Sequence, residues 1–86
     1  MKLFEIMINH KLNNITPEEL VKLASQHNVT LTSAQASTIS RLVNGKNINV
    51  FNQAEREALI KKIARATGVG TAAELESIFK QLTATL

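Results

Sequence analysis

The chain of 86 residues contains no cysteine, tryptophan or tyrosine, and only one proline. The absence of cysteine excludes disulfide bonds and cysteine-ligated metals, and it fits a reducing compartment. Since three phenylalanines are the only aromatic residues, the core must be built from Leu, Ile, Val and Ala, which suits helix packing better than a sheet. The length suits one domain, residues 1–86.

Long hydrophobic runs are also missing. The opening residues 1–8 carry one lysine, Glu5 interrupts their apolar run, and no small-residue cleavage site follows. This segment is therefore not a signal peptide, and no stretch is long enough to cross a bilayer. We expect a cytoplasmic protein without a membrane partner.

Helix-start signals, in contrast, are frequent. A capping box places Thr, Ser, Asn or Asp three residues before Glu or Gln, so that side chains satisfy two backbone N–H groups at the start of a helix. Four segments have this form: Thr16-Pro17-Glu18-Glu19, Thr32-Ser33-Ala34-Gln35, Asn52-Gln53-Ala54-Glu55 and Thr71-Ala72-Ala73-Glu74. Together with the apolar opening segment, they predict an all-α bundle of about five short helices.

Hydrophobic spacing predicts which faces of these helices point inward. In the first helix, from about residue 2 to 11, the expected inner residues are Leu3, Phe4, Met7 and Ile8. In the later helices they are Leu20, Leu23, Ala24, His27, Ala36, Ile39, Leu42, Val43, Leu59, Ile60, Ile63, Ala66, Leu75, Ile78, Phe79 and Leu82. Ile6 lies off its stripe, either as an isolated exposed residue or as a partner contact. Between helices three and four, the alternation of Ile48 and Val50 with asparagines predicts a short extended segment.

The net charge of +3 is unevenly distributed. Residues 1–40 are neutral, residues 41–65 carry six basic and two acidic side chains, and residues 66–86 carry a net −1. The residues expected to form a surface for an anionic partner are Arg41, Lys46, Lys61, Lys62 and Arg65. The alternative is a solvated face, with Glu57 partly neutralising Lys61 one helical turn away.

No catalytic or metal-binding pattern is recognisable. The two histidines, His10 and His27, fall on different helices, and most of the glutamates already serve helix starts. No serine or threonine stands in a nucleophile motif. We expect no enzyme activity, no cofactor and no metal.

One segment resembles part of a DNA-binding motif. Residues 39–46, with the segment around Val29, are similar to the recognition-helix end of phage-repressor-like helix-turn-helix domains. The resemblance implies that Ser37, Thr38 and Arg41 approach bases or phosphates. The stretch from Val29 to Ser40 is about five residues longer than the tight turn of that motif requires.

A second resemblance covers the whole chain. The opening Asn9-His10-Lys11-Leu12-Asn13-Asn14-Ile15-Thr16 and the later Gly45-Lys46-Asn47, Asn49-Val50-Phe51 and Thr71-Ala72 resemble a family of uncharacterised proteins from Bacillus-type Firmicutes, the YqfT-like domain of unknown function. This resemblance implies a cytoplasmic bacterial protein and assigns no activity, cofactor or site.

The sequence therefore favours a non-enzymatic module that binds an unknown protein partner through a helix face or the basic surface. The alternative is a helix-turn-helix-like protein that binds nucleic acid through residues 41–65. The sequence does not determine the oligomeric state.

Overall fold

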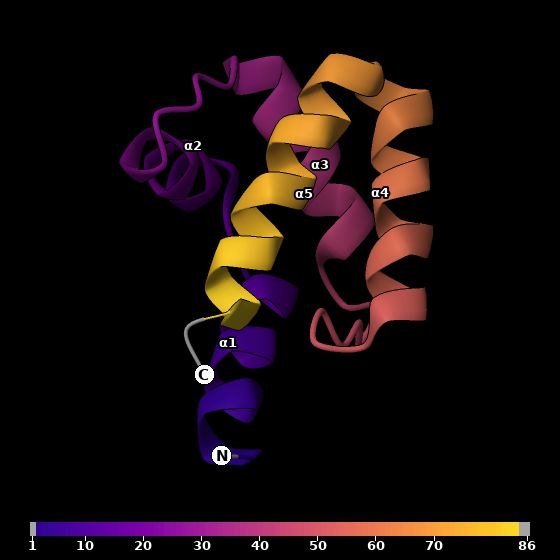
Figure 1. The fold of residues 1–86 in the computed structure, drawn as a ribbon. Coiled ribbons are helices and arrows are strands. Elements are labelled where there is room, and N and C mark those ends of the chain that lie inside the picture. The colour runs from indigo at the N-terminus through magenta and orange to yellow at the C-terminus, as the bar shows by residue number, and fades with distance from the viewer. Residues whose placement is uncertain (1, 85–86) are drawn as a thin grey trace.

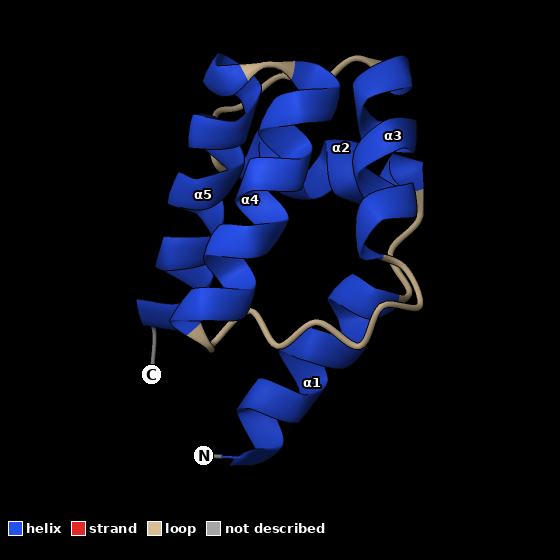
Figure 2. Ribbon diagram, turned by 90° about the vertical axis from the view of Figure 1, so that its right-hand side faces the viewer, coloured by secondary structure: helices blue, strands red, loops and turns tan. Residues whose placement is uncertain are grey.

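The computed structural model describes residues 2–84, which form five α-helices joined by short loops (Figure 1). The helices are α1 (Lys2–Asn13), α2 (Pro17–Gln26), α3 (Ser33–Val43), α4 (Gln53–Thr67) and α5 (Val69–Ala84). The described residues contain no strand, so the predicted all-α fold is confirmed (Figure 2). Helix α4 packs on both α3 and α5, and α2 packs on α3, whereas α1 extends from one end of the bundle (Figures 1 and 2).

Complete capping boxes begin α2 and α3, as predicted. The Thr16 hydroxyl accepts from the Glu19 backbone N–H at 3.1 Å, and the Glu19 carboxylate accepts from the Thr16 N–H at 3.0 Å. Thr32 and Gln35 exchange the same two bonds at 3.0 and 2.9 Å. Each pair satisfies two donors that a helix start leaves without intrahelical partners.

The cap of α4 is present, but its box is only half formed. The Asn52 side chain accepts from the Glu55 N–H at 3.0 Å. The Glu55 carboxylate accepts instead from the Asn49 N–H at 3.0 Å, within the preceding loop. The position of the helix start is therefore confirmed, while Glu55 stabilises the loop rather than the cap.

The predicted start of α5 at Thr71 is wrong. The helix begins at Val69, directly after Gly68, which ends α4 with φ = 101°. The Ala72 N–H donates to the Gly68 carbonyl at 3.1 Å, so Thr71 already lies in the first helical turn. Val69, the first residue of the helix, is 78% exposed.

The core is aliphatic, with a single aromatic side chain among its fully buried members. Its buried residues are Leu12, Ile15, Leu20, Ala24, Val29, Leu31, Ala36, Ile39, Val43, Val50, Leu59, Ile63, Ala72, Leu75, Ile78 and Phe79. The predicted inner faces of the helices after the first are largely confirmed, with Leu23, Leu42, Ile60 and Leu82 packed at the margin. Ala66 is exposed, and Ala64 takes its place against the core.

The predicted inner face of α1 is wrong. Leu3, Phe4 and Met7 are exposed, and α1 is anchored instead through Leu12, which is buried, and Ile8, which is half-buried. Buried contacts hold only the C-terminal half of α1, because its first two turns lie beyond the end of the bundle (Figure 1).

Asparagine side chains attach the segment before α4 to α1. Asn13 donates from Nδ2 to the Ile48 carbonyl at 3.2 Å and accepts at Oδ1 from the Ile48 N–H at 3.3 Å. One turn earlier, Asn9 accepts from the Val50 N–H at 3.0 Å and donates to Asn49 Oδ1 at 2.9 Å. The two amides thus bind backbone groups that would otherwise lack partners, and they hold Val50 in the core.

Candidate interaction surfaces

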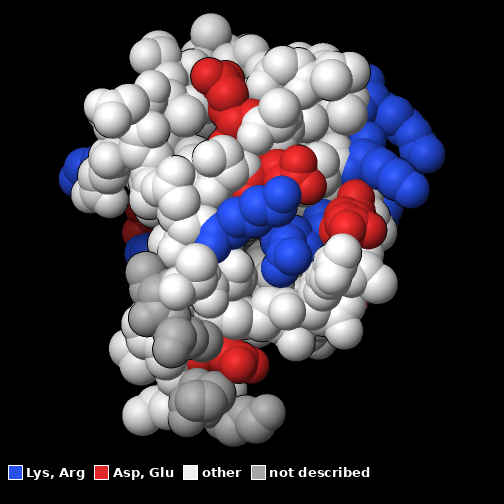
Figure 3. All heavy atoms as spheres, viewed as in Figure 1, with Lys and Arg blue, Asp and Glu red and all other residues white. Residues whose placement is uncertain are grey.

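The five predicted basic residues are all exposed, but they come from three different places. Lys61, Lys62 and Arg65 lie in the C-terminal half of α4, Arg41 lies in the last turn of α3, and Lys46 lies in the loop between these helices. In Figure 3, basic side chains gather along the α4 edge of the molecule, with acidic side chains beside them. We define Lys61, Lys62 and Arg65 as the α4 basic cluster.

The α4 basic cluster has no ion pair within residues 2–84, where the one pair found joins Lys11 and Glu19. Glu57, which partly neutralises Lys61 in the alternative of a solvated face, accepts a hydrogen bond from Gln53 at 2.9 Å. The charges of the cluster therefore face solvent without a partner in the described part of the chain.

Arg56, a sixth basic residue of the region, belongs to the interior. Its side chain is half-buried and donates from Nη1 to the Val50 carbonyl at 2.9 Å. Its buried Nε has no partner in the structure. Arg56 thus supports the segment before α4 through the Val50 carbonyl, so the charge available at the surface is smaller than the sequence sum suggests.

The N-terminal half of α1 carries a second surface, which the sequence did not reveal. Leu3 is 70% exposed, Phe4 38%, Ile6 62% and Met7 59%. We define these four residues as the α1 apolar end. Of them, only Ile6 was predicted to be exposed, with a partner contact as one of its two interpretations. Large apolar side chains gathered on one exposed surface are characteristic of a binding site.

A signal for this arrangement was present in the sequence. Glu5, Ile8 and Leu12 also follow helical spacing, and they form the side of α1 that is covered. Periodicity shows which residues share a face, and it does not show which of two faces meets the core.

The histidines do not form a site. His10 is exposed, and His27 caps the end of α2, where its Nδ1 lies 2.6 Å from Gln81 Oε1 on α5. With the amide in this orientation, Nδ1 donates. Throughout residues 2–84, no three His, Asp or Glu side chains lie together as a metal site requires.

Glu19 has the one clearly shifted pKa of the described residues. Hydrogen bonds from the Lys11 ammonium at 2.5 Å and from the Thr16 N–H lower its pKa from 4.5 to about 2. The ionised carboxylate thus joins the end of α1 to the start of α2. This is a structural contact, since Glu19 already completes a capping box.

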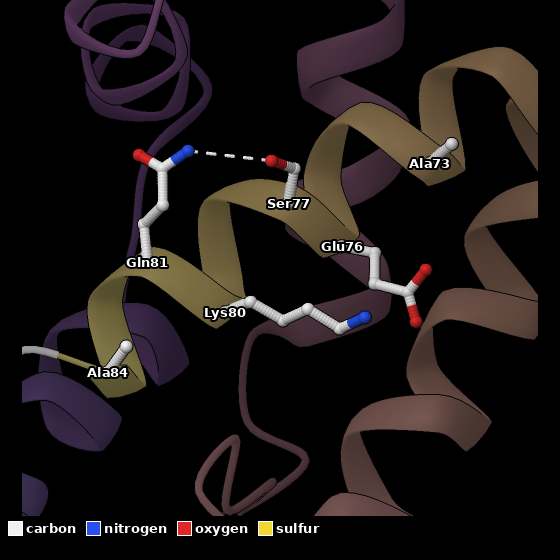
Figure 4. Close-up of a pocket in the computed structure, with 6 residues that line it drawn as sticks. All are labelled: Ala73, Glu76, Ser77, Lys80, Gln81 and Ala84. Atoms are coloured by element: carbon white, nitrogen blue, oxygen red, sulfur yellow. Dashed lines mark hydrogen bonds between the residues drawn. The ribbon is translucent and has the colours of Figure 1, made fainter.

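A surface hollow of about 450 Å³ lies along α5 and is lined by Ala73, Glu76, Ser77, Lys80, Gln81 and Ala84 (Figure 4). The Gln81 amide donates to Ser77 Oγ at 3.4 Å while its oxygen meets His27. Lys80 extends along the helix in the direction of Glu76 (Figure 4). The polar groups thus serve helix contacts and do not converge on a common point.

Five short helices around one aliphatic core, with an exposed apolar helix end, define a small all-helical domain. The chain matches over residues 1–83 a family described as "Protein of unknown function (DUF2624)", and it belongs to this family. It is 39% identical over 83 residues to the uncharacterized protein YqfT of Bacillus subtilis (strain 168). The matched region covers 96% of this chain and 99% of that protein. The resemblance inferred from the sequence is thereby confirmed.

No solved structure matches the chain significantly. No helix among the described residues has the length and hydrophobicity needed to span a membrane.

Proposed function

We propose that this chain is a non-enzymatic, cytoplasmic protein-interaction module that binds its partner through the α1 apolar end. The observation that supports this proposal is the exposure of four large apolar side chains on two successive helical turns. Leu3, Ile6 and Met7 are each more than half exposed in the folded chain, so the apolar area that they present is removed from water only on a partner.

The shape of the α1 apolar end suits this role. Amphipathic helices commonly bind in a groove through side chains spaced three and four residues apart. Leu3, Ile6 and Met7 have this spacing, and the first two turns of α1 stand clear of the bundle (Figures 1 and 2). A partner can therefore surround them without disturbing the core.

The experiment is affinity capture from a Bacillus-type cytoplasmic extract with wild-type chain and two variants. Ile6→Gln removes one apolar side chain from the α1 apolar end, and Val69→Gln removes an exposed apolar side chain at the start of α5 as a matched control. We expect a captured protein to be lost with Ile6→Gln and retained with Val69→Gln, at unchanged circular dichroism. Equal capture by all three chains would contradict the proposal.

The α4 basic cluster supports a second candidate function, nucleic-acid binding, because its three charges lack ion-pair partners in the described chain.

The residues that the helix-turn-helix resemblance places near bases or phosphates lie on α3. Arg41 donates to Ser37 Oγ at 3.2 Å, and Ser37 and Thr38 are half-buried. Six residues, 27–32, separate α2 from α3.

Binding to duplex DNA, single strands and RNA at about 50 mM salt, where phosphate contacts are strongest, tests this candidate. Replacement of Lys61, Lys62 and Arg65 by Gln should weaken binding and reduce its salt dependence, whereas Lys22→Gln, on exposed α2 surface, should do so much less. Failure of the wild-type chain to bind any of the three would exclude the candidate.

A further inference from the structure

Asn44 and Gly45, directly after α3, form the sequence pair that is most prone to spontaneous deamidation. In this reaction the backbone nitrogen of the residue after an asparagine attacks the side-chain amide carbon. A Cβ on that following residue hinders the attack, and glycine has none. The chain contains eight asparagines, and Asn44 is the one that glycine follows. In a chain without structure, the reaction is therefore expected at Asn44 first.

The fold holds both reacting groups in hydrogen bonds to the α1–α2 junction, which we define as residues 13–15. The Asn44 Nδ2 group donates to the Ile15 carbonyl at 2.8 Å. The Gly45 backbone N–H donates to the Asn13 carbonyl at 3.1 Å. Both bonds must break before the nitrogen can attack and the side-chain amide can turn toward it.

The backbone of Asn44 is also turned away from the reactive conformation. The reaction closes a five-membered ring, in which the Gly45 nitrogen is nearly eclipsed with the Asn44 Cβ. For an L-residue this alignment requires a negative ψ, whereas Asn44 has ψ = 131°. Rotation to a negative ψ moves the Gly45 N–H away from the Asn13 carbonyl, so the hydrogen bond and the reaction exclude each other.

We propose that Asn44 is a deamidation site that the fold keeps unreactive, and that it reacts when the α1–α2 junction detaches from residues 44 and 45. Among residues 2–84, the closely packed helix pairs are α4–α5, α2–α3 and α3–α4, and α1 belongs to none of them. Segments with few buried contacts open at the lowest free energy. The chemical state of Asn44 therefore records how often this junction has opened.

The reaction needs no reagent other than water. The Gly45 nitrogen loses its proton to solvent and bonds to Asn44 Cγ, while the bond from Cγ to Nδ2 breaks and the amide leaves as ammonia. Water then opens the cyclic imide. Cleavage at Cγ gives aspartate in a normal backbone, and cleavage at the backbone carbonyl gives isoaspartate, through whose side-chain carbonyl the chain continues. No atom is oxidised or reduced.

The product cannot restore the contacts that the reaction removed. Aspartate at position 44 lacks the Nδ2 donor and places a carboxylate oxygen near the Ile15 carbonyl, which then has lost this hydrogen bond. Isoaspartate adds a methylene to the backbone and displaces the Gly45 N–H from the Asn13 carbonyl. A single opening that ends in reaction thus weakens the α1–α2 junction permanently.

Incubation at mildly alkaline pH, followed by digestion and mass spectrometry of the separated Asn, Asp and isoaspartyl peptides, tests the proposal. The full chain is compared in buffer and in urea, and a synthetic peptide of residues 40–50 with and without urea corrects for the effect of urea on the reaction itself. In urea Asn44 should react fastest of the asparagines. Folding should slow it about tenfold or more, because two hydrogen bonds must open.

Two matched variants test which part of the molecule opens. Ile8 on α1 and Ile60 on α4 are both half-buried isoleucines packed on the core. Ile8→Ala should speed deamidation of the folded chain roughly fivefold by weakening the attachment of α1, whereas Ile60→Ala should react at close to the wild-type rate. Rates are compared where circular dichroism shows folded chains. If either alanine variant does not fold, Ile8→Val and Ile60→Val give the same comparison.

Three results would overturn the inference. A different asparagine that reacts fastest in urea would show that Asn44 is not the site. Equal rates at Asn44 in the folded and unfolded chain would show that the two hydrogen bonds do not protect it. Equal effects of the Ile8 and Ile60 substitutions would show that the α1–α2 junction does not control the reaction.

Discussion

Replacement of Asn13 by Asp should destabilise the domain by about 2–3 kcal/mol. The substitution keeps the shape of the side chain and removes both hydrogen bonds donated by Nδ2, to the Asn9 carbonyl at 2.8 Å and to the Ile48 carbonyl at 3.2 Å. It also places a carboxylate oxygen against the Ile48 carbonyl. Each lost bond costs about 1 kcal/mol, and a buried carbonyl left unpaired costs about 1–3 kcal/mol.

The neighbouring residue supplies a matched control. Asn14 donates from Nδ2 to the His10 carbonyl at 2.8 Å, which is the same four-residue bond that Asn13 makes to Asn9, but Asn14 is exposed and, among the described residues, makes no hydrogen bond to residue 48. Asn14→Asp should cost about 1 kcal/mol or less, including the effect of a negative charge near the end of a helix. The difference between the two variants isolates the attachment to Ile48.

Urea denaturation followed by circular dichroism measures both variants, since the chain has no tryptophan to report by fluorescence. A difference of about 1.5 kcal/mol corresponds to roughly 6–12 °C in Tm for a domain of this size. Equal losses of stability in Asn13→Asp and Asn14→Asp would refute the view that asparagine side chains hold the segment before α4 on α1.

Three further predictions follow from the caps and the loops. Thr32→Ala should cost about 1 kcal/mol as the loss of an N-cap, whereas Thr71→Ala should cost less than about 0.5 kcal/mol because Thr71 lies inside α5, a difference that denaturant midpoints will show. Gly45 has φ = 72°, and a Cβ added there would meet no neighbouring atom, so the backbone conformation alone resists a side chain. Gly45→Val should therefore destabilise the domain by more than Gly45→Asn, and equal denaturation midpoints would contradict this. Because Glu19 has its pKa lowered from 4.5 to about 2, its contribution is present above pH 4.5 and is lost as the pH falls toward 2. Glu19→Gln should therefore flatten the stability profile in that window, and an unchanged profile in an acid titration would count against the Lys11 contact.

The sequence predicts those features of the fold that depend on neighbouring residues. Thr16, Thr32 and Asn52 cap helices because each cap needs only a side chain and a backbone N–H three residues away. The prediction for Thr71 was wrong because the same local pattern also fits the first turn of a helix. This helix starts earlier in the chain, directly after Gly68.

Features that depend on residues distant in the sequence could not be predicted from it. Which face of α1 is covered depends on how Leu12 packs in the core, and the role of Asn13 in attaching the loop depends on its hydrogen bond to residue 48. In the same way, Arg56 counts as surface charge in the sequence and as an interior support in the structure. Residues 61, 62 and 65 are exposed on α4, as predicted. This could be predicted because the spacing of charged and apolar residues within one helix is enough to separate its two faces.

The attachment of α1 by its C-terminal half has a consequence for helix–coil equilibrium. An isolated 12-residue helix is marginal in water because its first turn must be nucleated at a large entropic disadvantage. Here the anchored turn around Leu12 supplies the nucleus, so the two N-terminal turns extend an existing helix, and each added residue gains a hydrogen bond. Amide hydrogen exchange should accordingly be graded along α1, fastest near Phe4 and slowest near Leu12, and contacts at the exposed turns should shift that gradient without refolding the domain.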